Sequence, residues 1–255
     1  MSKWVRFKHR DVTAFGKLVG DQILVHEGNM FEQPSATGEQ IALGDVELLT
    51  PVEPTKMVAM VNNFHALLDK LQMPVPKEPL YFFKANSSFL ADGKTIKRPL
   101  GYDGKIIFEG ELGLVIGKTC RNVSVSDAED YLFGCTCVND VTSFEILNRD
   151  PQFAQWTRCK AADTFGVMGP VVATGLDAGQ LTIRAVLNDQ ERQNYPITDM
   201  IFTPAELISA ISHDMTLLPG DVIACGTSVG VGTMRPGDRI TIEIEGVCSL
   251  SNPFE

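Results

Sequence analysis

The chain has 255 residues, of which 44% are hydrophobic and 21% charged, as in an ordinary globular protein with one sizeable core. Its net charge of -10 argues against a nucleic-acid partner, because phosphate binding needs a surface rich in Lys and Arg. No apolar run approaches the roughly 18 residues that a membrane span needs, and residues 1–11 do not resemble a secretory signal. We therefore expect a cytoplasmic protein that binds neither nucleic acid nor a membrane.

Residues 1–50 contain short segments in which apolar and polar residues alternate, the pattern of half-buried strands. Pro51 and Pro54 then form a joint. We expect a small β-rich N-terminal unit over residues 1–53 and a larger catalytic domain over residues 54–255. The larger domain should begin with a strand at 57–61, a helix at 64–71 and a second strand at 79–84.

The middle of the chain mixes strand patterns with short helices. The run at 106–117 (IIFEGELGLVIG) predicts a strand pair or one long bent strand. A capping-box pattern at Ser126 and Glu129 predicts a short helix through Phe133. A second one at Thr203 and Glu206 predicts a helix to about Ile211. The last third is again rich in strand patterns, so the expected fold class is α+β, a β-rich mixed fold and not a wound βαβ sheet.

The six cysteines raise the question of a metal site or disulfides. They contain no C-x-x-C pair, and the chain is neither short nor marked for secretion. Buried free thiols are the favoured interpretation for all of them, namely Cys120, Cys135, Cys137, Cys159, Cys225 and Cys248.

Three acidic residues stand in apolar surroundings. Glu109 and Glu111 are two residues apart in a strand pattern, so they share one face and would repel each other if buried without a cation. Asp140 ends another apolar segment. Together the three carboxylates predict a hard oxygen site for Mg²⁺, Mn²⁺ or Ca²⁺. The alternative is a solvated strand edge for the glutamates and a turn or helix cap for Asp140.

Several segments, in order along residues 55–255, resemble the fumarylacetoacetate hydrolase family. They are EGELGLVIGK (109–118), CVNDVTS (137–143), WTRCK followed by DTF (156–165), RQ (192–193), DMIF (199–202) and LLPGDVIACGTSVGVG (217–232). The resemblance implies that family's β-rich mixed fold, a homodimer, and Mg²⁺ or Mn²⁺ held by Glu109, Glu111 and Asp140, with Ca²⁺ as another occupant. It also implies that Lys160 points at a small oxo-acid substrate, whereas the pattern alone would allow a surface lysine.

The glycine-rich segment 226–232 is no nucleotide loop, because it lacks the P-loop lysine and the G-x-G-x-x-G spacing. In the family that it resembles, this segment brings a hydroxyl group and backbone amides to the substrate carboxylate. Thr227 and Gly226 are the candidate contacts. The alternative is a loop whose glycines serve only its turn geometry.

Two departures from the family pattern concern the reaction. The family's water-activating histidine falls on Leu67 here, and His65 stands two residues earlier, about 200° away on a helix. His65 is therefore either a displaced catalytic base or a lid residue. An Arg and a Gln that contact substrate in many relatives fall on Phe144 and Leu147, so Phe144 predicts a less charged or more apolar substrate tail.

Three functions remain open at this point. The first is a divalent-metal-dependent hydrolase that cleaves a carbon–carbon bond in an acylpyruvate-like diketo acid through a metal-chelated enolate. The second is an isomerase, tautomerase or decarboxylase of a 2-oxo or hydroxymuconate-type acid on the same metal platform. The third is a relative that binds a metal or metabolite without catalysis.

Overall fold

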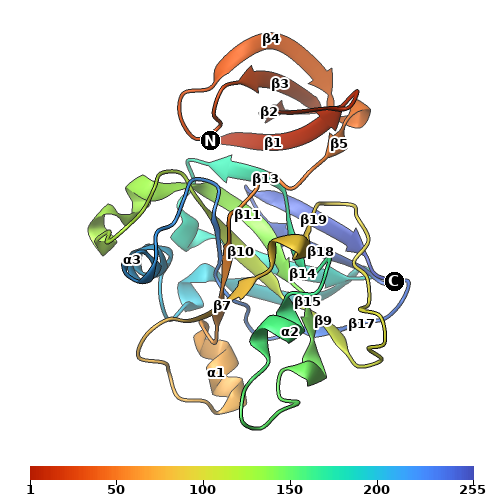
Figure 1. Cartoon of the computed structure of the whole chain (residues 1–255), viewed down its shortest axis with the longest axis vertical. Helices are drawn as coiled ribbons and strands as arrows, with labels where there is room; N and C mark the ends of the chain where they lie inside the picture. Colours follow the sequence, from red (N-terminus) through yellow and green to blue (C-terminus); the bar gives the residue numbers. More distant parts are fainter.

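A computed structural model describes all residues, 1–255, and its N-terminal part is a layer of antiparallel strands. In Figure 1 this layer lies at the top, beside the chain's N-terminus. Alternating apolar side chains of these strands, such as Val5 and Phe7, are fully buried beneath the layer. Its strands are β1 (Ser2–His9), β2 (Val12–Val19), β3 (Gln22–Glu27), β4 (Ser35–Ala42) and β5 (Glu47–Leu48).

The layer continues into the largest sheet of the molecule, because β1 pairs antiparallel with β13. The 12-stranded sheet runs in the order β4-β3-β2-β1-β13-β11-β10-β16-β6-β7, with β5 beside β1 and β8 beside β13. Its remaining strands are β6 (Met57–Val61), β7 (Leu80–Lys84), β8 (Phe89–Leu90), β10 (Gly110–Ile116), β11 (Leu132–Asp140), β13 (Gly166–Thr174) and β16 (Val222–Ala224). Strand β10 is buried along its whole length, as its continuous apolar run requires.

Two smaller sheets complete the β structure. A 4-stranded sheet, ordered β15-β14-β18-β19, packs against the centre of the large sheet. A 3-stranded sheet has the order β12-β9-β17. Their strands are β9 (Ile106–Phe108), β12 (Thr142–Ser143), β14 (Thr182–Leu187), β15 (Gln190–Pro196), β17 (Gly232–Met234), β18 (Arg239–Ile244) and β19 (Cys248–Pro253). A core of 40 buried residues fills the space between the sheets.

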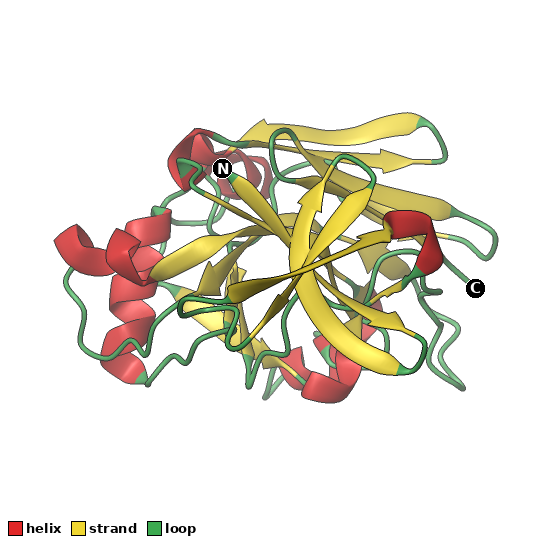
Figure 2. Ribbon diagram, turned by 90° about the horizontal axis from the view of Figure 1, so that it is seen from above, coloured by secondary structure: helices red, strands yellow, loops and turns green.

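Helices are few and lie at the periphery of the strands (Figure 2). They are α1 (His65–Leu71), α2 (Trp156–Lys160) and α3 (Pro204–Asp214). The predicted capping box of α3 is confirmed, since Thr203 and Glu206 exchange both cap hydrogen bonds. None of the helices is long and apolar enough to cross a membrane.

The predicted α+β, β-rich fold is confirmed, but one helix begins elsewhere than expected. A 3-10 helix runs from Val125 to Tyr131, and its cap is Ser124, whose hydroxyl accepts the N–H of Asp127. The prediction from Ser126 was therefore two residues late, and Phe133 lies inside β11. All six cysteines are free thiols, as expected, and only Cys248 is partly exposed.

Candidate metal centre and its surroundings

The three predicted acids meet where β10 and β11 run side by side. Glu109 occupies the break between β9 and β10, Glu111 follows on β10, and Asp140 ends β11. The antiparallel register brings Asp140 to Glu109, whose carbonyl oxygen accepts the N–H of Asp140 at 2.9 Å. One carboxylate oxygen from each residue lies within 4.8 Å of the others. The strand pair, together with the short break before β10, thus gathers the three carboxylates.

Two buried lysines face these carboxylates. The Nζ atom of Lys160, at the end of α2, lies 2.7 Å from Glu109 Oε1 and 2.6 Å from Asp140 Oδ2. The Nζ atom of Lys84, at the end of β7, donates to the other oxygen of Asp140. Lys84 is not among the residues predicted from the sequence. Its only local signal is a single lysine that closes the apolar strand segment LYFFK.

The aromatic side chains next to Lys160 fix its position. Trp156 stacks on Phe82 with ring centroids 5.4 Å apart and an interplanar angle of 16°. The Nζ atom of Lys160 lies 5.3 Å from the centroid of the same Phe82 ring. The short helix α2 therefore carries both the aromatic anchor and the lysine, so the packing of Trp156 sets where Lys160 points.

Burial and charge act differently on the charged groups of the centre. Burial raises the pKa of Glu111 far above its usual value, and Asp140 and Glu109 add to the rise. Burial would also raise the pKa of Asp140, but Lys160 and Lys84 outweigh it and lower that pKa. Burial lowers the pKa of Lys84, whereas the three carboxylates raise that of Lys160 above its usual value. Lys160 is therefore held firmly in its charged form.

The arrangement fits a divalent cation. Glu111 is completely buried, its Oε2 accepts the N–H of Gly226 at 2.9 Å, and its Oε1 has no hydrogen-bond partner. Three carboxylates face two lysine cations, and a divalent cation would take the place of the proton that the raised pKa keeps on Glu111. An unpartnered buried carboxylate oxygen in an all-oxygen cluster is what a hard cation such as Mg²⁺ or Mn²⁺ would complete.

The predicted loop contacts, Gly226 and Thr227, follow β16 in the chain and lie beside the three carboxylates. The hydroxyl of Thr227 donates to the carbonyl oxygen of Gly110 at 3.0 Å and accepts from Gln193 Nε2 at 2.9 Å. Gln193 in turn accepts the N–H of Gly110 at 3.0 Å. Gly226 and Thr227 therefore hold β10 and Glu111 in place, and a substrate would have to exchange one of these hydrogen bonds to reach the Thr227 hydroxyl.

The remaining predicted residues lie in the elements that border the loop and the acids. His65 is the first residue of α1 and is exposed. Leu67, at the family's histidine position, packs against the main core. Phe144 begins a 3-10 helix (Phe144–Ile146) four residues after Asp140, and half of its surface is exposed. The spacing of Thr142 and Glu145 in the sequence also fits a capping box, but no such cap forms.

The reason lies in where those two side chains go. Glu145 accepts the hydroxyl of Tyr102 and the N–H of Lys105, the latter at 2.9 Å. The hydroxyl of Thr142 donates instead to Glu109 Oε1 at 2.6 Å. Thr142 is therefore part of the acidic centre and orients Glu109, a role that the capping-box interpretation missed.

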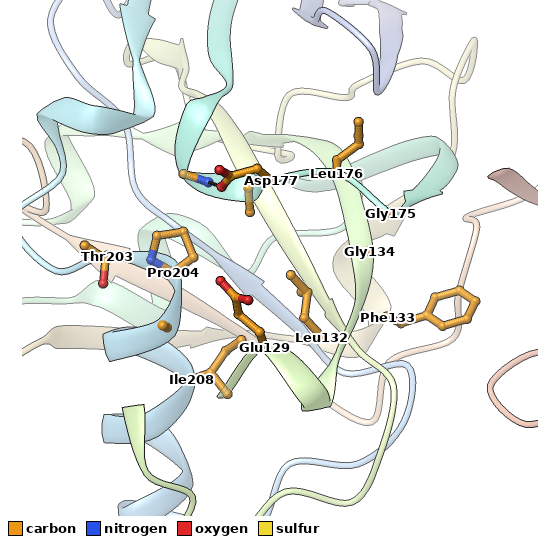
Figure 3. A pocket seen from close by; sticks show the side chains of 13 residues that line it. Glu129, Leu132, Phe133, Gly134, Gly175, Leu176, Asp177, Thr203, Pro204 and Ile208 are labelled. Atoms are coloured by element: carbon orange, nitrogen blue, oxygen red, sulfur yellow. Dashed lines mark hydrogen bonds between the residues drawn. The ribbon is translucent and has the colours of Figure 1, made fainter. Parts of the chain in front are cut away.

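A surface hollow of 590 Å³ lies elsewhere in the molecule (Figure 3). Glu129 and Asp177 contribute carboxylates to it, next to Pro204 and Leu132. None of the three clustered acids lines this hollow, so it is separate from the candidate metal centre.

Comparison with known proteins places this centre in a family. The pattern of the fumarylacetoacetate (FAA) hydrolase C-terminal domain matches residues 56–255, and that of the Rv2993c-like N-terminal domain matches residues 2–51. Oxaloacetate tautomerase YisK from Bacillus subtilis is 32% identical over 252 residues, which cover 91% of this chain and 83% of YisK.

Two solved structures share the fold over nearly their whole length. The 2-hydroxyhepta-2,4-diene-1,7-dioate isomerase from Mycobacterium marinum has a TM-score of 0.91 at 33% identity, covering 100% of this chain and 98% of the isomerase. Maleylpyruvate hydrolase from Sphingobium sp. SYK-6, solved with manganese(II) and pyruvate, has a TM-score of 0.80 at 27% identity, covering 99% of this chain and 98% of the hydrolase. By the match over residues 56–255 and these relatives, the chain belongs to the fumarylacetoacetate hydrolase family.

Proposed function

We propose that the protein is a Mg²⁺- or Mn²⁺-dependent tautomerase or isomerase that converts a small 2-oxo acid through its enolate. The observation that carries the proposal is the pairing of three clustered carboxylates with a lysine that stays charged, Lys160. Such a site binds an oxyanion that develops during the reaction, and it needs no water nucleophile. YisK and the M. marinum isomerase carry reactions of this class in their names.

The residues that would hold the cation are Glu109, Glu111 and Asp140. When bound, a divalent cation supplies Lewis-acid polarisation of a 2-oxo-carboxylate and neutralises the acids around it. The binding of manganese(II) with pyruvate by the related maleylpyruvate hydrolase supports this choice of cation and of substrate class.

Lys160 has the role of charge stabiliser in this proposal. Its Nζ atom hydrogen-bonds two of the three acids, and these same acids raise its pKa in the metal-free protein, so we assign it the role of a charged donor. A protonated Nζ atom can donate hydrogen bonds to the enolate oxygen of the substrate as negative charge develops there.

The half-exposed ring of Phe144 supports an apolar tail on the substrate. Phe144 follows the Asp140 segment directly, so a substrate bound at the acids can extend toward it. An aromatic ring offers contact area to such a tail and no partner for a second carboxylate.

Carbon–carbon bond hydrolysis is the second candidate, favoured by the likeness to maleylpyruvate hydrolase. It needs a group that activates water, and His65 is the one histidine near α1 that could do so. His65 is exposed, its side chain has neither a hydrogen-bond partner nor a carboxylate partner, and Leu67 occupies the position that holds the histidine in the family. Hydrolysis therefore has less support from the site than tautomerisation.

A product screen separates these reactions. The protein with Mg²⁺ or Mn²⁺ is given oxaloacetate, acylpyruvates or hydroxymuconate-type dienoates, and products are followed by ultraviolet absorbance and mass spectrometry. We expect an unchanged mass with a changed spectrum. Products that sum to substrate plus water would establish the hydrolase, and loss of CO₂ a decarboxylase. The absence of any metal-dependent turnover would contradict all three.

Three variants and one control connect the activity to the site. Lys160→Met should reduce turnover by roughly 10²-fold or more and keep the metal-induced rise in melting temperature. Glu111→Gln should remove that rise, while Glu129→Gln in the hollow of Figure 3 keeps it. If the protein is a tautomerase, His65→Ala should leave its turnover nearly unchanged. If it is a hydrolase that uses His65 as the base, turnover should fall by about 10²-fold or more.

A further inference from the structure

Two cysteine thiols meet where the large sheet packs on the 4-stranded sheet. Cys137 lies in β11 and Cys248 begins β19, and they are 111 residues apart in sequence. Their sulfur atoms are 3.3 Å apart. A disulfide needs a sulfur–sulfur distance of about 2.05 Å, so a movement of little more than 1 Å would join them.

One of the two thiols has access to solvent. Cys137 is completely buried, whereas Cys248 is partly exposed. Cys248 also lines a surface hollow of 300 Å³, together with Thr182, Arg184, Glu243, Ile244, Glu245 and Ser249. Of the two residues, Cys248 is therefore the one that a molecule as small as a hydroperoxide meets first, although its sulfur points inward, toward Cys137 Sγ and the carbonyl oxygen of Gly169 at 3.2 Å.

The surroundings make Cys248 the more reactive partner. Burial raises the pKa of its thiol, but hydrogen bonding with Cys137 and with the backbone of Val171, together with the charge of Lys3, outweighs burial and lowers that pKa. The thiol also donates to the carbonyl oxygen of Gly169 at 3.2 Å. Burial raises the pKa of Cys137 well above its usual value. Cys248 therefore reaches the nucleophilic thiolate form more readily, while Cys137 stays a neutral thiol beside it.

We propose that Cys137 and Cys248 form a redox modification site, which a hydroperoxide oxidises to a disulfide between β11 and β19. The Cys248 thiolate attacks one peroxide oxygen, the O–O bond breaks, and the product alkoxide or hydroxide takes up a proton. The resulting sulfenic acid is attacked by the sulfur of Cys137. The S–S bond forms, the S–O bond breaks, and water leaves with the proton of Cys137.

The bridge would form on the opposite face of β11 from the metal centre. Cys137 faces the main core with Ile242 and Leu250, whereas its neighbour Val138 packs with Phe82 on the other side. Asp140 is two residues from Val138 and so shares its face. Oxidation therefore ties the two sheets together without placing a sulfur atom among the acids.

The test uses the full-length, metal-loaded protein and hydrogen peroxide. Remaining thiols are alkylated under denaturing conditions, and intact mass and peptide maps are recorded. We expect the loss of two hydrogen atoms, one linked peptide pair containing Cys137 and Cys248, and full reversal by dithiothreitol. Cys248→Ser should abolish the linked pair. The control Cys120→Ser, which removes a buried thiol elsewhere, should retain it.

Cys137→Ser should stop the reaction at a sulfenic acid on Cys248, which dimedone would trap. Should that core variant fail to fold, Cys248→Ser and the wild-type peptide map still decide, because Cys248 is only partly buried. The proposal is overturned if Cys248 remains fully alkylatable after peroxide. It is also overturned if Cys248 becomes sulfinic acid in the wild type while Cys137 stays a free thiol.

Discussion

Asp140 lies between two buried lysines, each of which donates to a different oxygen of its carboxylate. The side chains of Asp140 and Lys84 have no exposed surface at all. Breaking an ion pair in such a buried place strongly destabilises the protein, because the remaining partner keeps its charge and loses an opposite charge beside it. Lys84 therefore stabilises the acidic centre before any cation binds.

We expect Lys84→Met to lower the free energy of unfolding of the metal-free protein by about 3 kcal/mol. Part of the loss should return with Mn²⁺, because the cation supplies charge compensation that Lys84 provided. Urea unfolding in EDTA and in Mn²⁺ measures both effects. The control Lys94→Met breaks an exposed ion pair with Glu47 and should change stability by less than about 1 kcal/mol. Equal effects from the two variants would contradict the assigned role of Lys84.

The acids could be predicted from sequence and Lys84 could not. Glu109 and Glu111 are two residues apart, just before and within β10, and their polarity in an apolar run is visible in the sequence itself. Lys84 reaches Asp140 only in the folded protein, because the two residues are 56 positions apart in the chain and their strands, β7 and β11, are separated by β10, β16 and β6 in the sheet order. A lone lysine at a strand end is more often solvated than buried, so no local pattern marks it.

At the scale of elements, the start of α1 is fixed by a single buried amide. Asn63 donates to the carbonyl oxygen of Cys225 at 3.0 Å and to that of Phe202 at 3.3 Å, and it accepts the N–H of Phe202 at 2.9 Å. Phe64 beside it packs edge-on against Tyr195 at 4.9 Å. These contacts tie α1 to the residue before Gly226, and hence to the support of Glu111.

Asn63→Ala should therefore cost roughly 2 kcal/mol of unfolding free energy, because it leaves one buried and two partly buried backbone groups without this partner. It should also weaken turnover, since the Cys225–Gly226 turn loses its anchor. Chemical denaturation and the product assay measure these effects. Asn194→Ala, which removes an exposed amide on β15, should change stability by no more than about 0.5 kcal/mol. A stable, fully active Asn63→Ala would show that α1 is held by other contacts.

The elements themselves were predictable where the signal is local. The helix α3 combines a capping residue, a proline at its first turn and apolar spacing, and its start is where the pattern placed it. The 3-10 helix after Ser124 was misplaced because Ser124 and Ser126 both fit a cap, and only the folded backbone selects between them. Thr142 was misassigned for a related reason, since its hydroxyl finds a stronger acceptor in Glu109.

At the scale of the molecule, strand order was beyond local patterns. Strand β16 pairs parallel with β6, more than 160 residues earlier, and β1 pairs with β13. Such pairings depend on which apolar faces are buried against each other. Many strand orders are compatible with the same alternation of apolar and polar residues along the chain. The family resemblance supplied the β-rich class, but the joining of the N-terminal layer to the large sheet was visible only in the structure.

The pairing of β1 with β13, which joins the N-terminal layer to the large sheet, predicts how the protein unfolds. The layer of β1–β5 is hydrogen-bonded to β13 and also packs on the larger part through Phe133, whose ring lies 5.0 Å from Phe31 and 6.3 Å from Trp4. A shared sheet and a shared aromatic cluster couple the two parts energetically. We therefore expect one cooperative transition, although the sequence suggests two units divided near residue 53.

The two tryptophans provide the measurement, because Trp4 reports on β1 and Trp156 on the helix that carries Lys160. Trp156→Phe leaves fluorescence from Trp4 alone, and Trp4→Phe leaves it from Trp156 alone. Circular dichroism of each variant serves as the internal reference, since each substitution shifts stability somewhat. In each variant the fluorescence and circular-dichroism midpoints in urea should coincide. If instead the Trp4 fluorescence midpoint lies at a lower urea concentration than the circular-dichroism midpoint of the same variant, the N-terminal unit unfolds on its own while the larger part is still folded.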